Sequence, residues 1–411
     1  MRILLSTRGS AGHVLPLAPF GQAARRAGHD VLVVAQRQHA ANVDRTGLSF
    51  ALVDEAPPET WQPLLGSFSR LPIDEANAKV IGEYFARIDT EATLPGVREL
   101  VETWRPDLIL RESWEYASAL VAELHAIPIV RVGLGLTGME EESIALAAPA
   151  LDAQRAALGL PADPAGDRLR ETPFFTMLPA LLDDADATGT PARIRRFRQA
   201  EPVLDAASSA PLPDWWPGNA DPLVYLSFGS VAGAAHMPYF PALYRMAIDA
   251  LAPLPVRVLV TIGDGRDPAA LGELPANVHV ERWIPQDAVL PHAALSVSHG
   301  GYGSTLGALA HGVPLVVVPL FSMDQWANAA AVARAGAGIA LGADRDIRLV
   351  MDLPDARTLE GLAPAVQALL HDGATRRRAR ELGAAMAGAA PVEEAIDELV
   401  ALASEGACAR Q

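Results

Sequence analysis

The chain has 411 residues, of which half are apolar and 20% are charged, so it is long enough to form two domains with buried cores. Its formal net charge of −16 opposes binding to nucleic acid or to an anionic membrane surface. The single cysteine, Cys408, excludes an intrachain disulfide and fits a reducing compartment. The opening apolar run is too short for the core of a signal peptide, and no apolar stretch reaches membrane-spanning length. We therefore expect a cytoplasmic protein whose partners are small molecules.

Short apolar strands alternate with helices in both halves of the chain. In the first half we predict strands at residues 2–6, 31–35, 108–110 and 129–132, with helices at 15–27 and 116–125. In the second half we predict strands at residues 223–228, 256–262, 278–280, 295–298 and 315–318. Continuous apolar strands in this alternation are typical of parallel sheets with helices on both faces.

The segment 201–222 lies between the two series and is rich in Ala, Ser and Pro, which suits an interdomain linker. We predict an N-terminal domain at residues 1–205, a linker at 206–222 and a C-terminal domain at 223–390. We expect the helix and tail at 391–411 to pack back on the N-terminal domain. The predicted fold class is α/β, with two Rossmann-like, doubly wound domains facing each other across a cleft, where a ligand would bind by default.

A glycine-rich turn at residues 298–307 follows a predicted buried strand and opens a predicted helix. Backbone N–H groups and hydroxyls at such a helix N-terminus can bind a ligand anion, and the glycines let the backbone approach it closely. His299 can donate a hydrogen bond or, if protonated, supply a positive charge. A second turn, Gly229-Ser230, offers another amide and hydroxyl. Glycine turns also join strands to helices in many domains without binding a ligand, and this reading fits the second turn better than the first.

Polar and aromatic residues flank the glycine-rich turn. Trp283 and Gln286 precede it, while Asp324 and Gln325 follow it. Trp283 can stack on a base, and the Asp-Gln pair can hydrogen-bond to sugar hydroxyls. Taken singly, Trp283 could equally be a core or interface aromatic, and Asp324 could be a helix cap.

The order and spacing of these residues resemble the nucleotide-sugar signature of family-1 glycosyltransferases, in particular the bacterial group that decorates polyketide and other natural-product aglycones. The resemblance implies a GT-B fold, a base stacked near Trp283, phosphates at the glycine turns and a sugar near Asp324 and Gln325. It implies a nucleotide sugar as co-substrate and no further cofactor. The implied donor-binding residues are Ser10, Gly12, Ser230, Trp283, Ile284, Gln286, His299, Gly301, Gly303, Ser304, Thr305, Asp324 and Gln325.

One position departs from the plant version of this signature. There a glutamate, eight positions after the motif histidine, accepts hydrogen bonds from both ribose hydroxyls, whereas this chain has Gly307. Losing that acceptor removes little from a deoxyribose, which has no 2′-hydroxyl. We therefore expect a dTDP-linked donor in preference to a UDP-linked one.

His13 follows a glycine turn at the predicted carboxyl edge of the first sheet and is the candidate general base. A helix N-terminus disfavours the imidazolium, so the ring can accept the proton of an attacking hydroxyl. The resemblance implies that a carboxylate just after the strand 108–110 orients this histidine. Glu112 stands at the position where the family has aspartate, and Glu115 is the alternative.

Direct attack by the acceptor on the anomeric carbon predicts inversion of configuration, with the leaving diphosphate stabilised by the His299 turn. We predict that no metal takes part, because no Asp-x-Asp pair lies at a suitable strand end. The acidic run Asp183-Asp184-Ala185-Asp186 falls in an irregular stretch.

Large apolar residues in the first half suit a hydrophobic acceptor, although core packing explains each of them equally well. The candidate acceptor-binding residues are Trp61, Phe68, Trp114 and Phe174. Two rivals keep the fold but change the chemistry, namely C-glycosyl transfer and nucleotide-sugar epimerisation. A third rival is a non-catalytic activator of another transferase. The sequence leaves open whether the chain forms a homodimer.

Overall fold

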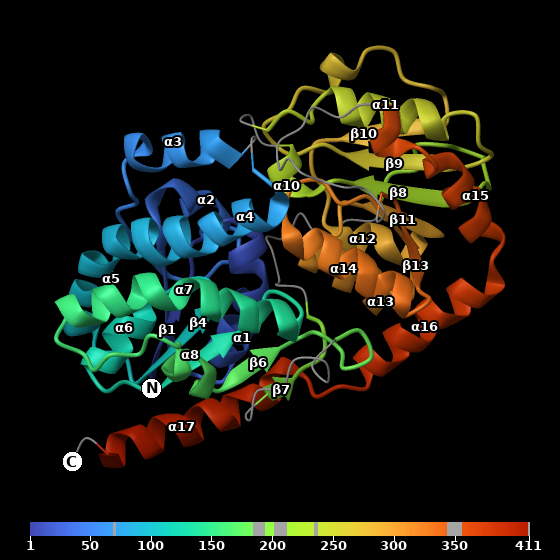
Figure 1. The fold of residues 1–411 in the computed structure, drawn as a ribbon. Coiled ribbons are helices and arrows are strands. Elements are labelled where there is room, and N and C mark those ends of the chain that lie inside the picture. The colour runs from blue at the N-terminus through green and yellow to red at the C-terminus, as the bar shows by residue number, and fades with distance from the viewer. Residues whose placement is uncertain (69–70, 184–193, 201–211, 234–236, 343–355, 410–411) are drawn as a thin grey trace. The chain divides into compact units, whose positions relative to one another are not determined.

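The computed structural model describes residues 1–68, 71–183, 194–200, 212–233, 237–342 and 356–409. The chain divides into two compact units (Figure 1), and each unit is made of segments that are separated in the sequence. Unit 1 consists of residues 1–68, 74–205 and 389–411, and unit 2 of residues 69–73 and 206–388. Among the described residues, no helix combines the length and the apolar character needed to cross a membrane.

Unit 1 is built on a seven-stranded parallel sheet in the order β3-β2-β1-β4-β5-β6-β7. The strands are β1 (Arg2–Ser6), β2 (Asp30–Gln36), β3 (Phe50–Val53), β4 (Leu108–Glu112), β5 (Ile129–Val132), β6 (Phe174–Thr176) and β7 (Ile194–Arg196). The helices are α1 (Ala11–Arg26), η1 (Arg37–His39), α2 (Ala40–Asp44), α3 (Pro58–Phe68), α4 (Ile73–Ala78), the π-helix η2 (Lys79–Asp89), α5 (Thr90–Trp104), α6 (Ala117–Leu124), α7 (Thr137–Ala157), α8 (Asp167–Glu171), η7 (Val392–Glu394) and α17 (Ala395–Ala409).

Helices cover both faces of this sheet. Successive strand residues point to opposite faces, so neighbouring residues contact different helices. Leu4 belongs to a buried cluster with residues of α5 and α6, such as Val97 and Val121. Its neighbour Leu5 points the other way and contacts α1 closely, since a Cβ on Gly21 would lie 2.5 Å from Leu5 Cδ2. The strands are therefore apolar on both faces, as the sequence pattern predicted.

Unit 2 has a six-stranded parallel sheet in the order β10-β9-β8-β11-β12-β13. The strands are β8 (Leu223–Ser227), β9 (Arg257–Thr261), β10 (Val278–Glu281), β11 (Leu295–Ser298), β12 (Leu315–Val317) and β13 (Gly338–Ala340). The helices are α10 (Gly229–Ala232), α11 (Ala242–Leu251), η4 (Pro268–Leu271), α12 (Gln286–Val289), η5 (Leu290–His292), α13 (Tyr302–Ala310), α14 (Met323–Arg334), η6 (Ala356–Leu359), α15 (Leu362–His371) and α16 (Gly373–Ala387).

In each sheet the chain adds strands on one side and then, from one point on, adds them on the other side. In unit 1 the order changes direction between β1 and β4, and in unit 2 between β8 and β11. Ligands of doubly wound sheets bind outside the carboxyl ends of the strands at this switch point. The predicted class of two Rossmann-like, doubly wound domains is confirmed, and it directs attention to the loops after these four strands.

Part of the predicted linker packs on unit 2. Trp215 stacks on His279 of β10, with ring centroids 4.6 Å apart and an interplanar angle of 21°. The first six residues predicted as linker, 206–211, lie outside the described residues. At the other end of the chain, α17 and η7 pack against α1 within unit 1.

Candidate active site

The switch point of unit 1 brings His13 and Glu112 together. His13 lies in the first turn of α1, which begins directly after the extended residue Ser10, and Glu112 is the last residue of β4. Nδ1 of His13 is 2.9 Å from Oε1 of Glu112. No described residue contacts Nε2 of His13 through a hydrogen bond. When Nδ1 carries the proton and donates to Glu112, Nε2 has a free lone pair and can act as a base.

Glu112 is wholly buried, yet its carboxylate is stabilised in the ionised form. Burial raises its pKa, but His13 and the N–H of Trp114, 2.6 Å from Oε2, together with Arg8 outweigh this effect and hold the pKa below its usual value. Glu115 is also buried but interacts with Ser118 instead of His13, and burial raises its pKa. The carboxylate that reaches the imidazole is therefore Glu112, and its additional methylene does not prevent the contact.

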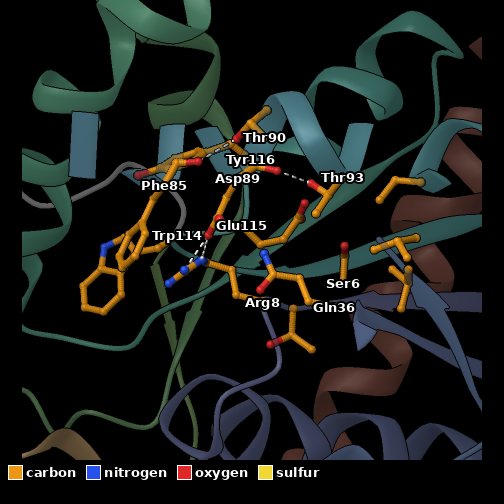
Figure 2. A pocket seen from close by; sticks show the side chains of 14 residues that line it. Ser6, Arg8, Gln36, Phe85, Asp89, Thr90, Thr93, Trp114, Glu115 and Tyr116 are labelled. Atoms are coloured by element: carbon orange, nitrogen blue, oxygen red, sulfur yellow. Dashed lines mark hydrogen bonds and ion pairs between the residues drawn. The ribbon is translucent and has the colours of Figure 1, made fainter. Parts of the chain in front are cut away.

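An ion pair between Arg8 and Asp89, shown in Figure 2, lies next to Glu112. Arg8 Nε donates to Asp89 Oδ2 over 2.7 Å, and its guanidinium lies 3.5 Å from the ring centroid of Phe85. The backbone N–H of Arg8 also donates to Glu112 Oε1 over 3.3 Å. Arg8, Phe85 and Asp89 were not among the residues predicted from the sequence. Two adjacent aromatic residues, Tyr84 and Phe85, are the only local signal that could have pointed to η2.

Aromatic rings surround His13. Its imidazole meets the rings of Phe85 and Trp114 edge-on, at centroid distances of 6.1 and 5.6 Å. Trp61 continues the row through Tyr84, at 6.0 Å. Trp61 and Trp114, both predicted to bind the acceptor, are partly exposed and belong to this row.

Phe68 and Phe174 do not meet the expectation for acceptor-binding residues. Phe174 is 1% exposed because its ring packs under the guanidinium of Arg131, 4.4 Å away, and against Gly133. Phe68 is also buried, at the end of α3. Both are core residues, which the apolar pattern alone cannot distinguish from pocket residues.

The loops at the switch point of unit 2 hold the second set of candidate residues. His299 follows β11, and its ring lies between the two glycine turns. A Cβ on Gly229 would lie 2.5 Å from Cε1 of His299, and a Cβ on Gly301 would lie 2.6 Å from Nε2. Glycine at these positions was expected to let a ligand approach the backbone closely. The structure adds a second reason, since a side chain at either position would displace the histidine.

Two polar atoms on this turn are buried without a hydrogen-bond partner, Nδ1 of His299 and Oγ1 of Thr305. Burial lowers the pKa of His299 to about 4, so the imidazole is neutral near pH 7 and cannot supply a positive charge. Helix α13 begins here at Tyr302, and Gly301 provides no side-chain cap. Gly303 is exposed and Ser304 is partly exposed, so the first turn of the helix presents N–H groups at the surface.

Trp283 and Gln286 lie in the loop and short helix that follow β10. Trp283 is 42% exposed, which is unusual for so large an apolar side chain. Ile284, also predicted to contact the donor, is partly exposed beside it. Gln286 fills the space above Gly307: a Cβ on Gly307 would lie 2.4 Å from Nε2 of Gln286, which also donates to the carbonyl of Gly303 over 3.2 Å.

The other predicted donor-binding residues differ in their exposure and in the hydrogen bonds that they already make. Asp324 is partly exposed in the first turn of α14 and accepts a hydrogen bond from Ser322. Gln325 is only 2% exposed, and its side-chain oxygen accepts from the N–H groups of Leu320 and Phe321. The side-chain oxygen of Gln325 therefore stabilises the turn before α14. Only the side-chain NH₂ group of Gln325 remains to bind a ligand. Ser230 is exposed in α10.

Ser10 and Gly12 lie in unit 1 at the start of α1, where Ser10 is partly exposed and Gly12 is exposed. The described residues contain no group of three His, Cys, Asp or Glu side chains arranged to hold a metal ion. Of the acidic run 183–186, only Asp183 is described. Its carboxylate accepts hydrogen bonds from Thr137 and pairs with Arg196, so its contacts are with other residues of unit 1.

Solved structures with the same architecture are glycosyltransferases. SnogD from Streptomyces nogalater has a TM-score of 0.73 and 27% identity, over 98% of this chain and 99% of that chain. SsfS6 from Streptomyces sp. SF2575, solved with thymidine diphosphate, has a TM-score of 0.72 and 25% identity, over 97% of this chain and 99% of that chain. The protein is thus a GT-B glycosyltransferase that uses a nucleotide sugar.

Family models and relatives define the group more closely. The N-terminal and C-terminal domain models of erythromycin biosynthesis protein CIII-like proteins match residues 22–159 and 245–402. L-demethylnoviosyl transferase from Streptomyces niveus is 33% identical over 84% of this chain and 86% of that protein. Elloramycin glycosyltransferase from Streptomyces olivaceus is 31% identical over 93% of this chain and 92% of that protein. The chain belongs to this family of bacterial natural-product glycosyltransferases, as the resemblance of its motifs predicted.

Proposed function

We propose that this enzyme transfers a sugar from a dTDP-linked donor to a hydroxyl group of a hydrophobic aglycone, with inversion and with His13 as the general base. The observation that carries the proposal is the 2.9 Å contact between His13 Nδ1 and the buried, ionised Glu112. This contact fixes the tautomer that leaves Nε2 free to accept a proton.

In the proposed reaction, Nε2 of His13 takes the hydroxyl proton while the acceptor oxygen attacks the anomeric carbon. The bond to the diphosphate breaks on the opposite face. Glu112 stabilises the imidazolium that forms, and the surrounding aromatic rings provide an apolar surface for the aglycone.

We assign the diphosphate to the N-terminus of α13, whose uncapped N–H groups and helix dipole favour an anion. The unpartnered hydroxyl of Thr305 supports this assignment, and neutral His299 can contribute a hydrogen bond but no charge. The thymidine diphosphate in the SsfS6 structure, a relative at 25% identity, supports a dTDP donor. So does the side chain of Gln286, because it occupies the space that a carboxylate at position 307 would need.

The test uses the purified chain, a panel of hydrophobic aglycones, and one sugar linked either to dTDP or to UDP. We expect turnover with a preference for dTDP of at least about threefold, the value of one hydrogen bond. Equal or faster turnover with the UDP-linked sugar would contradict the donor assignment. His13→Ala should abolish transfer and leave dTDP binding unchanged, and near-normal turnover of that variant would refute the base assignment.

Product analysis separates the alternatives. An anomeric coupling constant of inverted configuration and a C–O linkage, both read by NMR, support the proposal. A C–C linkage or an epimerised nucleotide sugar would identify the rival chemistries on this fold. Turnover by the isolated protein would exclude a purely activating role, and unchanged turnover in EDTA is expected for a reaction without a metal.

A further inference from the structure

The orientation of the His13 imidazole depends on more than its hydrogen bond to Glu112. That bond holds Nδ1, but a hydrogen bond tolerates a tilt of roughly 30° with little loss, and the ring torsion of histidine has a broad minimum. A tilt displaces Nε2, the atom that takes the proton in the proposed reaction, and a displacement of about 1 Å can cost a hundredfold in rate. Packing against the ring must supply the remaining constraint.

Two aromatic rings meet this imidazole edge-on, and they are anchored differently. Trp114 follows Glu112 closely in the chain, and its N–H binds the same carboxylate that His13 contacts. Phe85 belongs to a separate element, η2, so it needs a connection to the loop between β1 and α1. Arg8 provides that connection, because its guanidinium lies 3.5 Å from the centroid of the Phe85 ring, within the range of a cation–π contact.

Asp89 holds the guanidinium over this ring. It is the last residue of η2, and its Oδ2 accepts from Arg8 Nε over 2.7 Å and also pairs with Nη2 (Figure 2). The side chains of Arg8 and Asp89 are only 11% and 6% exposed, so water screens the pair little. The end of η2 is itself fixed by α5, since Thr90 Oγ1 donates to the carbonyl of Phe85 and Thr93 Oγ1 to that of Asp89, both over 2.8 Å.

Arg8 also reaches the other support of the imidazole, through its backbone. Its N–H donates to Oε1 of Glu112 over 3.3 Å, the same oxygen that Nδ1 of His13 contacts. A largely buried ion pair is weak evidence for a contribution to stability, because removing two charges from water costs about as much as their attraction returns. What the pair between Arg8 and Asp89 does supply is a fixed position for the Phe85 ring.

We propose that Arg8 is a positioning residue for the general base: its guanidinium, held by Asp89, keeps the ring of Phe85 against the imidazole of His13. Its backbone N–H supports the carboxylate that His13 binds. The proposal rests on the assignment of His13 as the base in the proposed function. Arg8 acts on the reaction through these neighbours and takes no proton itself.

The first test is a comparison of single and double variants by steady-state kinetics. Arg8→Ala and Phe85→Ala should each lower kcat by about tenfold to a hundredfold, because Nε2 is displaced, and leave the KM of the donor unchanged. The double variant, Arg8→Ala with Phe85→Ala, should lose no more than the larger single loss, since both changes remove the same contact. Losses that multiply would show that Arg8 acts independently of Phe85 and would overturn the proposal.

Arg155→Ala is the matched control for a general loss of stability. Arg155 is another largely buried arginine of unit 1 and pairs with Glu123 over 2.6 and 2.7 Å. Glu123 lies in the last turn of α6, just before β5, and therefore at the end of the sheet opposite His13. The control should leave kcat of the folded protein unchanged, and a loss as large as that of Arg8→Ala would overturn the proposal.

A second variant covers the case in which Arg8→Ala does not fold. Arg8→Ala combined with Asp89→Ala removes both charges and leaves no carboxylate buried without a partner. It should show the same loss of kcat as expected for Arg8→Ala, with folding checked by thermal unfolding. A folded double variant with undiminished kcat would overturn the proposal.

Histidine ring spectra separate a failure of this proposal from a failure of the proposed function. In ¹H–¹⁵N NMR spectra of the full chain, the ring signals of His13 are those lost in His13→Ala. They should shift in Arg8→Ala, because the Phe85 ring moves, and stay in place in Arg155→Ala. Unshifted signals in Arg8→Ala would overturn the role of Arg8 even if no aglycone is turned over. Near-normal turnover of His13→Ala would instead refute the base on which the proposal rests.

Discussion

A carboxylate removed from water needs hydrogen-bond donors to stay ionised, and Glu112 has three of them. They come from His13, Arg8 and Trp114, that is, from the start of α1, the loop before it and the loop after β4. The position of Glu112 is therefore fixed from both sides of the switch point. The same contacts fix the imidazole, since the carboxylate binds only the Nδ1 side of the ring.

Glu112→Gln removes the negative charge while keeping the size of the side chain. We expect kcat to fall by roughly 10²- to 10⁴-fold, because the imidazolium loses its counterion and the preferred tautomer is no longer enforced. Steady-state kinetics at saturating donor measure this effect, and dTDP affinity should not change. Glu115→Gln is the matched control, since Glu115 interacts with Ser118. A larger loss of kcat in the control would show that the wrong carboxylate had been assigned.

His299 should make the protein less stable in acid. Its pKa is about 4 in the folded chain and 6.5 in the unfolded chain, so between these values the unfolded state binds more protons. Stability is fully present above pH 6.5 and falls as the pH is lowered toward 4, by about 3 kcal/mol from this group. His39, whose pKa burial also lowers to about 4, acts in the same direction.

A comparison with His299→Gln isolates this contribution. Chemical denaturation between pH 4 and pH 7 should give a flatter dependence of unfolding free energy on pH for the variant than for the unaltered protein. Parallel curves for the two proteins would contradict the burial argument. The remaining slope of the variant includes the contribution of His39.

The N-terminus of α13 depends on the absence of a side chain at Gly301. This residue has an ordinary extended backbone, φ −61° and ψ 150°, so replacement by alanine introduces no backbone strain. Its Cβ would nevertheless collide with the ring of His299. At Gly303, two residues further, a Cβ would meet nothing within 4 Å.

The pair Gly301→Ala and Gly303→Ala therefore separates packing from helix propensity. Gly301→Ala should cost about 1–3 kcal/mol of stability by displacing His299, and it should weaken dTDP binding. Gly303→Ala should stabilise the protein by up to about 1 kcal/mol, since alanine is the better helix former. Thermal unfolding without ligand measures both. Similar melting temperatures for the two variants would mean that His299 can move aside freely.

Sequence periodicity located nine strands of the described residues within two residues, because buried parallel strands are short, continuous apolar runs between glycines and prolines. It did not predict β3, β6, β7 and β13, of which β6, β7 and β13 have only three residues each. Strands β1, β5 and β11 have the predicted bounds. No helix was predicted between residues 58 and 104, where the structure has α3, α4, the π-helix η2 and α5. Helix η2 carries Phe85 and Asp89, which is why the ring and the carboxylate around Arg8 were missed.

The local motif of the glycine turn predicted where His299 and Trp283 lie, because the motif and its surroundings are contiguous in the chain. The choice between Glu112 and Glu115 required the backbone path after β4, which places only the first near His13. Likewise, an apolar pattern indicates that Phe174 is either a core residue or an acceptor-binding residue, but it does not decide between the two. Contacts that join distant segments, such as Arg8 with Asp89, have no local signal.

The chain leaves unit 1, forms unit 2 and then returns to unit 1. Residues from 389 onward belong to unit 1, where Arg26 pairs with Glu393 over 2.6 Å and Phe197 forms a β-bridge with Ala390. Ile396 and Leu399 of α17 are buried there. The last segment thus contributes to the core of the first unit.

Removal of residues 389–411 should destabilise unit 1 and spare the fold of unit 2. The deletion takes away Val392, Ile396 and Leu399, each worth about 1.5–3 kcal/mol when fully buried, and the sum is comparable to the stability of a typical domain. Hydrogen exchange with mass spectrometry should show fast exchange in β1 and α1 and continued protection in β8 and β11. Deleting residues 408–411 alone is the control, and equal exchange in the two deletions would contradict the prediction.

The returning segment also affects the order in which the protein can mature on the ribosome. Domains usually fold from the N-terminus as they emerge, but the core of unit 1 includes residues that are translated after all of unit 2. Unit 1 therefore cannot complete its core before the last residues of the chain have been made, and until then α1 lacks the cover that α17 provides.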